Sequence, residues 1–182
     1  SEDYVRSAPG GTGACKAGGN YAASLYAMRL ANEMGYTQVL WLDAVERKYV
    51  EEVGTSNVFF MIGEELITPP LAGTILAGIT RESLGILCKE LKLPFVERAI
   101  HIEEVFQGLA KGDCTEIFGC GTAAVVSPVG ELLDEGAVVR HHHERARVGG
   151  EVALQPFDGG QVEVVGRLVE QQQIGILRQH LG

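Results

Sequence analysis

Between residues 38 and 68 the chain shows a series of runs of strand length, the first of them mostly apolar, separated by turns of only a few residues. Turns this short join antiparallel strands, because a parallel crossover needs a dozen or more residues and usually a helix. The pattern therefore predicts a meander and argues against alternating strand–helix–strand units. The predicted strands cover Gln38–Asp43, Arg47–Val53, Asn57–Ile62 and Leu66–Thr68.

Segments with helical periodicity lie outside this meander. Asn20 is predicted to cap a helix over Tyr21–Met34, and Thr80 to cap a helix over Arg81–Leu91. Strands and helices segregated in this way indicate an α+β fold, and we expect a single domain over residues 1–182. The later predicted elements are a strand over Phe95–Ile100, a short helix over Ile102–Ala110 and a final helix over Val164–Leu181.

The charge balance argues against a nucleic-acid or membrane-surface partner. The chain has 24 acidic residues against 15 lysines and arginines, a net charge of −9, and a negatively charged surface would repel it. The densest basic stretch is Arg140–Arg147, which we interpret as a solvated loop, with an anion or metal site as the less favoured alternative. No segment reaches the ~20 apolar residues of a membrane helix.

The cysteines favour a reducing compartment. They form no CxxC pair and no ordered framework, so we expect reduced thiols, a cytoplasmic protein and no metal site. The four residues are Cys15, Cys88, Cys114 and Cys120.

Lys16 stands in a glycine-rich stretch, Gly10–Tyr21, that raises the question of a phosphate loop. A Walker A loop would need Gly before the lysine and Ser or Thr after it, but Cys15 and Ala17 occupy those places. A surface lysine in a flexible loop is the simplest alternative. Against it, the small residues on both sides would let a flat cofactor approach the backbone closely.

The stretch Gly10–Tyr21 resembles the lysine loop of the branched-chain aminotransferases, which are fold-type IV pyridoxal phosphate enzymes. Three further blocks follow in the order of that family, so the resemblance covers the chain from about Tyr4 to Val129. The first block runs from Gln38–Ala44 on to Tyr49–Phe60, the second is Thr68–Arg81, and the third is Phe118–Val129.

This resemblance implies a specific fold and domain organisation. The chain would be the C-terminal pyridoxal phosphate-binding domain, in which meandering strands form a pseudo-barrel with flanking helices. The small N-terminal domain of the family, which supplies an arginine for the phosphate and aromatic residues for the substrate pocket, would be absent from this chain.

The resemblance also assigns residues to the ring of the cofactor. Lys16 would bind pyridoxal 5′-phosphate as a Schiff base and carry the proton at the substrate Cα, which requires partial burial and a nearby cation to lower its pKa. Tyr21 would bind the phenolic oxygen, and Glu52 the pyridinium nitrogen. A tyrosine packed in the core and a solvated strand carboxylate are the structural alternatives. Glu51 would point to the opposite face of the strand.

A second group of residues would bind the phosphate and the substrate. The backbone N–H groups of Ile79 and Thr80, at the start of a helix, would bind the phosphate together with the Thr122 hydroxyl. The amides of Thr122 and Ala123 would face the substrate carboxylate. Ala124 and Ser127 replace the CxxC pair of mammalian relatives, so we expect no thiol switch there.

The implied reaction is transamination of leucine, isoleucine or valine with 2-oxoglutarate, by a protein that forms a homodimer at full length. D-amino-acid aminotransferases and aminodeoxychorismate lyases share the lysine and the glutamate, but the Gly-Gly-Thr-Gly loop and the Val-Leu-Trp-Leu-Asp strand favour the branched-chain group. A different alternative is a catalytically incompetent domain with a structural or dimerisation role.

Overall fold

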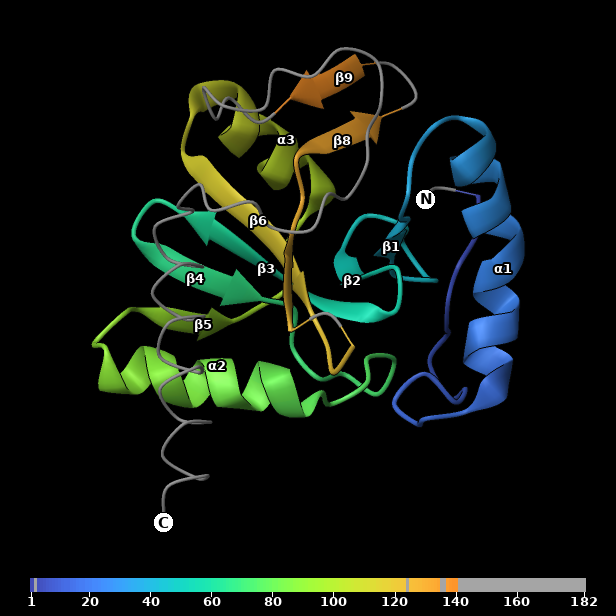
Figure 1. Ribbon diagram of the computed structural model, residues 1–182, viewed down its shortest axis with the longest axis horizontal. Coiled ribbons are helices and arrows are strands. Elements are labelled where there is room, and N and C mark those ends of the chain that lie inside the picture. Colours follow the sequence, from blue (N-terminus) through green and yellow to red (C-terminus); the bar gives the residue numbers. More distant parts are fainter. Residues whose placement is uncertain (2, 124, 135–136, 141–182) are drawn as a thin grey trace.

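The computed structural model describes residues 1, 3–123, 125–134 and 137–140. The helix predicted at Val164–Leu181 and nearly all of the basic stretch Arg140–Arg147 lie outside these residues. Within the described part, three helices and nine strands follow one another along the chain (Figure 1). The helices are α1 (Gly18–Glu33), α2 (Ile79–Glu90) and α3 (Ile102–Lys111).

The strands build one seven-stranded sheet and a separate hairpin. The first four strands run antiparallel in chain order, which confirms the predicted meander. They are β1 (Leu40–Leu42), β2 (Val50–Val53), β3 (Ser56–Ile62) and β4 (Glu65–Thr68). The later strands are β5 (Phe95–Glu97), parallel to β4; β6 (Cys114–Cys120), antiparallel to β3; β7 (Val126–Pro128), paired with β6; and the hairpin of β8 (Glu131–Asp134) and β9 (Ala137–Arg140).

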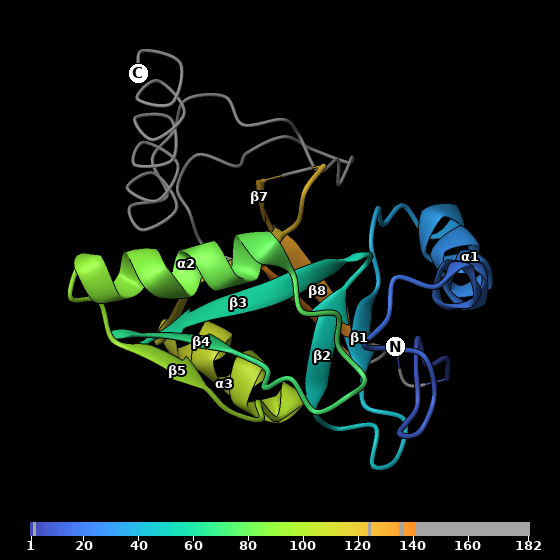
Figure 2. The same ribbon diagram turned by 90° about the horizontal axis from the view of Figure 1, so that it is seen from below.

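Strand β3 is the centre of the sheet and organises two apolar cores. Because side chains alternate along a strand, Val58 and Phe60 join the core that includes Val105 of α3, whereas Phe59 and Met61 join the core that includes Leu84 of α2. Figure 2 shows the two helices on opposite faces of the sheet. The α+β class is thus confirmed, and the expected pseudo-barrel appears among the described strands as an open sheet that branches at β3.

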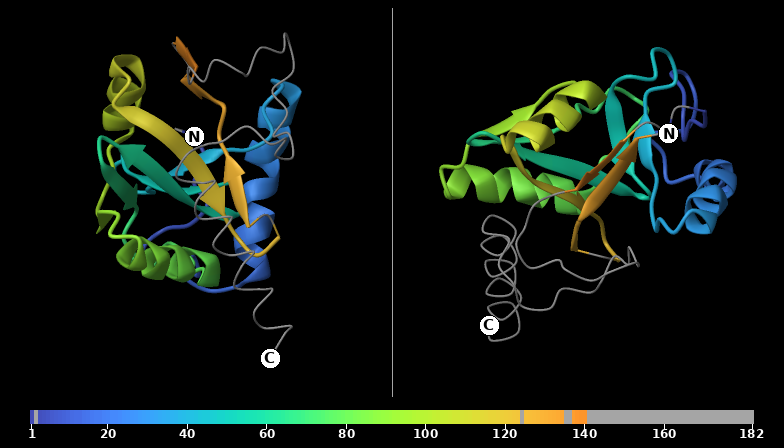
Figure 3. Two further views of the ribbon diagram at one scale, coloured as in Figure 1. Left: turned by 60° about the vertical axis from the view of Figure 1, so that its left-hand side comes forward. Right: turned by 90° about the horizontal axis from the view of Figure 1, so that it is seen from above.

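Helix α1 lies apart from the two main cores, beside β1 and β2 (Figure 3). A small third core joins it to the sheet through Ala27 and the fully buried Trp41. The indole Nε1 of Trp41 donates to the carbonyl of Gly54 at 2.8 Å, so the only tryptophan is satisfied at both its apolar and its polar end.

Both predicted helix caps are wrong in detail. Helix α1 begins at Gly18 after Ala17, so Asn20 lies in the first turn, and helix α2 begins at Ile79 after Gly78, so Thr80 is not the capping residue. Neither helix has a side-chain capping bond at its start. Asn20 does not cap the helix because its side chain is hydrogen-bonded to the loop before the helix.

Candidate cofactor site

The site begins with a row of residues across the sheet. Trp41, Glu52, Asn57 and Cys120 are register partners from β1 to β2 to β3 to β6. Partners in antiparallel register present their side chains to the same face, so Glu52 and Asn57 are neighbours on one side of the β2–β3 hairpin. The sheet therefore places a carboxylate and an amide together near the start of α2.

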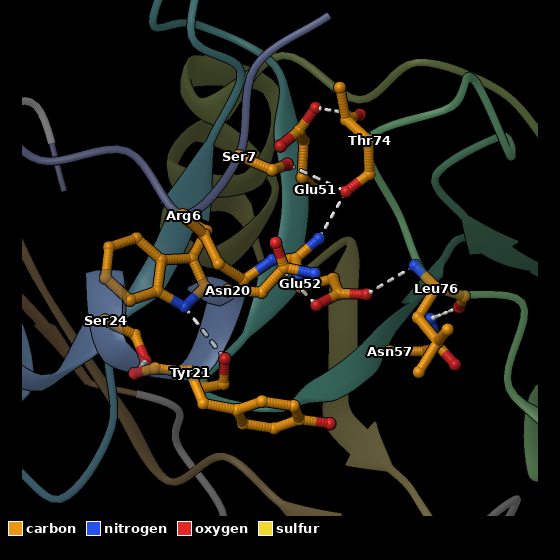
Figure 4. A network of polar contacts seen from close by, with 12 residues as sticks. Arg6, Ser7, Asn20, Tyr21, Ser24, Glu51, Glu52, Asn57, Thr74 and Leu76 are labelled. Carbon is orange, nitrogen blue, oxygen red and sulfur yellow. Dashed lines mark hydrogen bonds and ion pairs between the residues drawn. The ribbon is translucent and has the colours of Figure 1, made fainter. Parts of the chain in front are cut away.

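Glu52 is almost completely buried, with 3% of its surface exposed. Its Oε2 lies 2.9 Å from Nε of Arg6 in an ion pair, and its Oε1 accepts the backbone N–H of Leu76 at 3.1 Å (Figure 4). Burial raises the pKa of Glu52 to about 7, against the lowering effects of Arg6, of the Leu76 N–H and of Lys16. The alternative of a solvated strand carboxylate is wrong for Glu52.

Glu51 is buried as well, although it precedes Glu52 on the same strand. Its Oε1 accepts a hydrogen bond from the Thr74 hydroxyl, two residues before the Leu76 amide that reaches Glu52. Burial raises the pKa of Glu51. The segment of residues 74–76 therefore contacts both carboxylates of β2, and Figure 4 shows it beside them.

Arg6 ties the beginning of the chain to this segment. Its guanidinium donates to the carbonyl of Thr74, and the Ser7 hydroxyl donates to the same oxygen at 2.8 Å. Gly13 lies against this point, because a Cβ added there would come 2.3 Å from the Thr74 carbonyl oxygen. Only a glycine lets the lysine loop pack so closely on the segment.

The lysine loop is held closed by Asn20. The Asn20 amide donates to the carbonyls of Thr12 at 2.8 Å and Cys15 at 2.9 Å, and its oxygen accepts the Thr12 hydroxyl at 2.7 Å. These bonds tie the backbone at Thr12 and Cys15, directly before Lys16, to the first turn of α1. The sequence pattern suggested a helix cap for Asn20, and the loop closure was missed.

Lys16 and Tyr21 lie together at the open side of the site. The Nζ of Lys16 is 5.6 Å from the centroid of the Tyr21 ring, and Tyr21 is 37% exposed. The alternative of a tyrosine packed in the core is therefore wrong. Lys16 is exposed, so the expected partial burial is also wrong for this chain. The charge of Lys16 lowers the pKa of Glu52, against the larger raising effect of burial.

The residues expected to bind phosphate lie at the start of α2. Ile79 and Thr80 are the first two residues of the helix, where backbone N–H groups lack helical partners and favour an anion. Thr122 and Ala123 are exposed and follow β6, whose last residue, Cys120, pairs with Asn57. All the expected residues therefore lie around one end of the sheet.

These groups fit a pyridoxal phosphate. An amine, a phenol, a buried carboxylate and a helix N-terminus match the aldehyde, the phenolic oxygen, the ring nitrogen and the phosphate, respectively. The sequence did not reveal Arg6, Ser7 and Thr74, because contacts between segments more than 60 residues apart leave no local pattern. Within the described residues, no group of three or more His, Cys, Asp or Glu side chains could hold a metal ion.

The comparison with known proteins identifies the family. Residues 3–132 match the family model described as amino-transferase class IV, and the chain belongs to this family. The branched-chain-amino-acid transaminase 1 of Bacillus subtilis is 56% identical over 138 residues, which cover 76% of this chain and 39% of that protein. A probable branched-chain-amino-acid aminotransferase of Staphylococcus aureus is 49% identical over 158 residues, covering 86% of this chain and 43% of that protein.

Solved structures agree with this relationship. The branched-chain amino acid aminotransferase of Escherichia coli has a TM-score of 0.69 at 29% identity, covering 92% of this chain and 48% of that one. The enzyme of Thermobaculum terrenum in its PLP form has a TM-score of 0.62 at 30% identity, covering 71% and 40%. The chain thus spans less than half the length of these relatives. No helix in the described part of the chain is long and apolar enough to cross a membrane.

Proposed function

We propose that this chain forms the pyridoxal phosphate-binding domain of an enzyme that transfers the amino group of leucine, isoleucine or valine to 2-oxoglutarate. The observation that carries the proposal is the buried Glu52, which is hydrogen-bonded to Leu76 just before the N-terminus of α2. The charge of Lys16 lowers the pKa of the same carboxyl group. The names of the relatives support branched-chain amino acids as substrates. Because the chain covers under half of each relative, the activity is proposed for the full product of its gene.

When bound, pyridoxal phosphate supplies an electron-withdrawing ring that stabilises negative charge at the substrate Cα. Lys16 is the residue that would bind the cofactor covalently, and its free amine would take up and return the proton at the substrate Cα. Its exposed position leaves the amine free to move between these points. Tyr21, whose ring lies beside the Lys16 amine, is the residue that would donate a hydrogen bond to the phenolic oxygen of the cofactor.

Glu52 holds the proton of the ring nitrogen. Its pKa of about 7 means that the carboxyl group carries a proton for part of the time at neutral pH and can pass it to a basic nitrogen. Arg6 then stabilises the carboxylate that remains. In this buried environment the Arg6–Glu52 pair would keep the ring nitrogen protonated.

The remaining expected residues bind the two anionic groups. Ile79 and Thr80 offer backbone N–H groups to the phosphate, and Thr122 adds its hydroxyl. The amides of Thr122 and Ala123 bind the substrate carboxylate. The exposure of both residues supports this role, because a substrate must reach them from outside.

The same proposal covers assembly and location. We propose that residues outside this chain complete the pocket, as a small N-terminal domain, and that the full protein is a cytoplasmic homodimer. The free thiols of all four cysteines are consistent with a reducing compartment. The exposed apolar residues Leu25 and Tyr26 of α1, with Met34 directly after the helix, offer a surface for contact with another part of the protein.

The first test is spectroscopic. Pyridoxal phosphate added to the purified chain should give a visible absorbance band that Lys16→Ala abolishes, whereas Lys89→Ala, an exposed lysine at the far end of α2, should leave the band unchanged. A band of equal intensity in all three proteins would exclude Lys16 as the cofactor lysine.

The second test is transamination of leucine with 2-oxoglutarate, measured on the chain alone and on the full gene product. The open position of Lys16, Thr122 and Ala123 favours one competing possibility, in which the isolated chain binds cofactor but does not turn over. Activity in the isolated chain would exclude the incompetent-domain alternative. Activity towards D-alanine but not leucine in the full product would favour a D-amino-acid aminotransferase.

A further inference from the structure

Residue Leu76 is held at both ends of its backbone by the β2–β3 hairpin. Its N–H donates to Glu52 of β2 at 3.1 Å, and its carbonyl accepts the side-chain amide of Asn57 of β3 at 2.9 Å. Glu52 and Asn57 are register partners across the hairpin. One residue is thus clamped between two buried side chains whose spacing the sheet fixes.

This clamp lies between the two ends of the proposed cofactor. Leu76 is three residues before Ile79, the first residue of α2, and contacts Glu52 directly. A movement of Leu76 would therefore change the distance between the helix N-terminus and the carboxylate. Neither hydrogen bond is part of regular secondary structure, so two side chains of the hairpin hold Leu76 in the segment that leads into α2.

Gly78 supplies an independent observation on the same contact. A Cβ added at Gly78 would lie 2.2 Å from Oδ1 and 3.4 Å from Cγ of Asn57, while the nearest atom of another residue, a carbon of Arg81, would be at an ordinary 3.8 Å. The backbone angles of Gly78, φ −75° and ψ 137°, suit any residue. The glycine is therefore required by the Asn57 side chain and not by backbone conformation.

We propose that Asn57 is a positioning residue for the cofactor, which fixes Leu76 so that the phosphate-binding start of α2 and the ring-binding Glu52 keep their correct separation. The inference rests on the proposed function, and it extends that function to a residue outside the expected contact set. Asn57 acts through Leu76, with Gly78 leaving the space in which the Asn57 amide sits.

A double-mutant cycle on the cofactor-free chain tests the contact. Asn57→Ala removes the amide, and Gly78→Ala pushes the same amide away from Leu76, so the two substitutions destroy one interaction. The double variant should be as stable as Asn57→Ala, apart from the small stability difference between glycine and alanine at the position before a helix. Additive losses in chemical denaturation would overturn the proposal.

Cofactor binding tests the positioning role. Asn57→Ala should weaken binding of pyridoxal phosphate about tenfold, as expected for loss of one buried hydrogen bond, and weaken pyridoxal much less because pyridoxal has no phosphate to place. The matched control is Thr68→Val, which removes a buried hydrogen bond from the Thr68 hydroxyl of β4 to the carbonyl of Val58 in β3. This control should leave the ratio of the two affinities unchanged.

The outcomes separate the two proposals. Equal weakening of pyridoxal phosphate and pyridoxal in Asn57→Ala would show a merely structural role and overturn the inference. A missing Lys16-dependent band in the wild-type chain would instead overturn the proposed function, while the stability cycle would still show whether Asn57 holds Leu76.

Discussion

Nε of Arg6 lies 2.9 Å from Oε2 of Glu52, and the two side chains are only 7% and 4% exposed. A buried ion pair is strongly destabilising when one partner is removed, because the remaining charge has neither water nor a counterion. Here the remaining carboxylate can become neutral by taking up a proton, since its pKa is already raised to about 7. The dependence of stability on pH therefore reports the state of this pair.

Arg6→Met should destabilise the cofactor-free chain by about 3 kcal/mol at pH 7, because Glu52 loses its counterion and Thr74 loses a donor. The deficit should be smaller at pH 5, where Glu52 is protonated and needs no cation. Urea denaturation at both pH values measures the difference. The control Arg29→Met breaks an exposed pair with Glu33 and should cost less than about 1 kcal/mol at either pH. An equal deficit for Arg6→Met at both pH values would contradict this account.

Glu52→Gln should flatten the pH dependence of stability. The folded-state pKa of Glu52 is about 7, above its ordinary value of 4.5, so the folded state binds the proton more tightly than the unfolded state. This contribution is complete below pH 4.5 and is lost as pH rises through 7, and it amounts to at most about 3 kcal/mol. Glutamine cannot titrate.

Thermal unfolding of the cofactor-free chain at pH 5 and pH 8 checks this prediction. The wild type should lose more stability than Glu52→Gln over that interval. Glu51, whose pKa is also raised by burial, is present in both proteins and raises the pKa of Glu52, so the difference measures Glu52 together with its coupling to Glu51. If both proteins lost the same stability, the proton would have to be bound elsewhere.

Asn20→Ala should loosen the lysine loop. The substitution leaves the carbonyls of Thr12 and Cys15 without their donor and should cost about 1–3 kcal/mol, partly offset by the better helix propensity of alanine. Hydrogen exchange should speed up over residues 12–16. Asn32→Ala, an exposed asparagine in the same helix, provides the control and should not change exchange in the loop. Unchanged exchange in Asn20→Ala would show that Gly13 packing alone holds the loop.

The sequence predicted the parts of the fold that depend on local pattern. Short turns predicted the antiparallel meander of β1 to β4, and two glutamates in the first turn marked the start of α3 correctly at Ile102. Strand lengths were overestimated, as at Gln38–Asp43, where only Leu40–Leu42 pair. Val39 and Asp43 still form backbone hydrogen bonds with Gly54 and Tyr49, so the sequence pattern marks the extended segment and not the end of the ladder itself.

The site shows the complementary limit. The resemblance assigned Glu52 and the start of α2 to one site, and the structure brings Glu52 into a hydrogen bond with Leu76, three residues before α2. It did not show that Arg6, Asn57 and Asn20 hold the site together, since each acts by a side-chain contact to a distant or irregular segment. An isolated arginine or asparagine has many possible partners, and only the tertiary structure selects one.

The four cysteines should differ sharply in reactivity. Burial raises the pKa of Cys114 and Cys120 to about 12 and also raises that of Cys88, whereas Cys15 is exposed in the lysine loop. At pH 8 a thiol with a pKa near 12 is ionised to only about one part in ten thousand, so it reacts negligibly while folded. An aromatic disulfide reagent should therefore modify one thiol quickly in the cofactor-free chain and the other three only after denaturation. Cys15→Ser should abolish the fast phase, and a second fast thiol in that variant would mean that one of the buried cysteines is reached by local opening of the sheet.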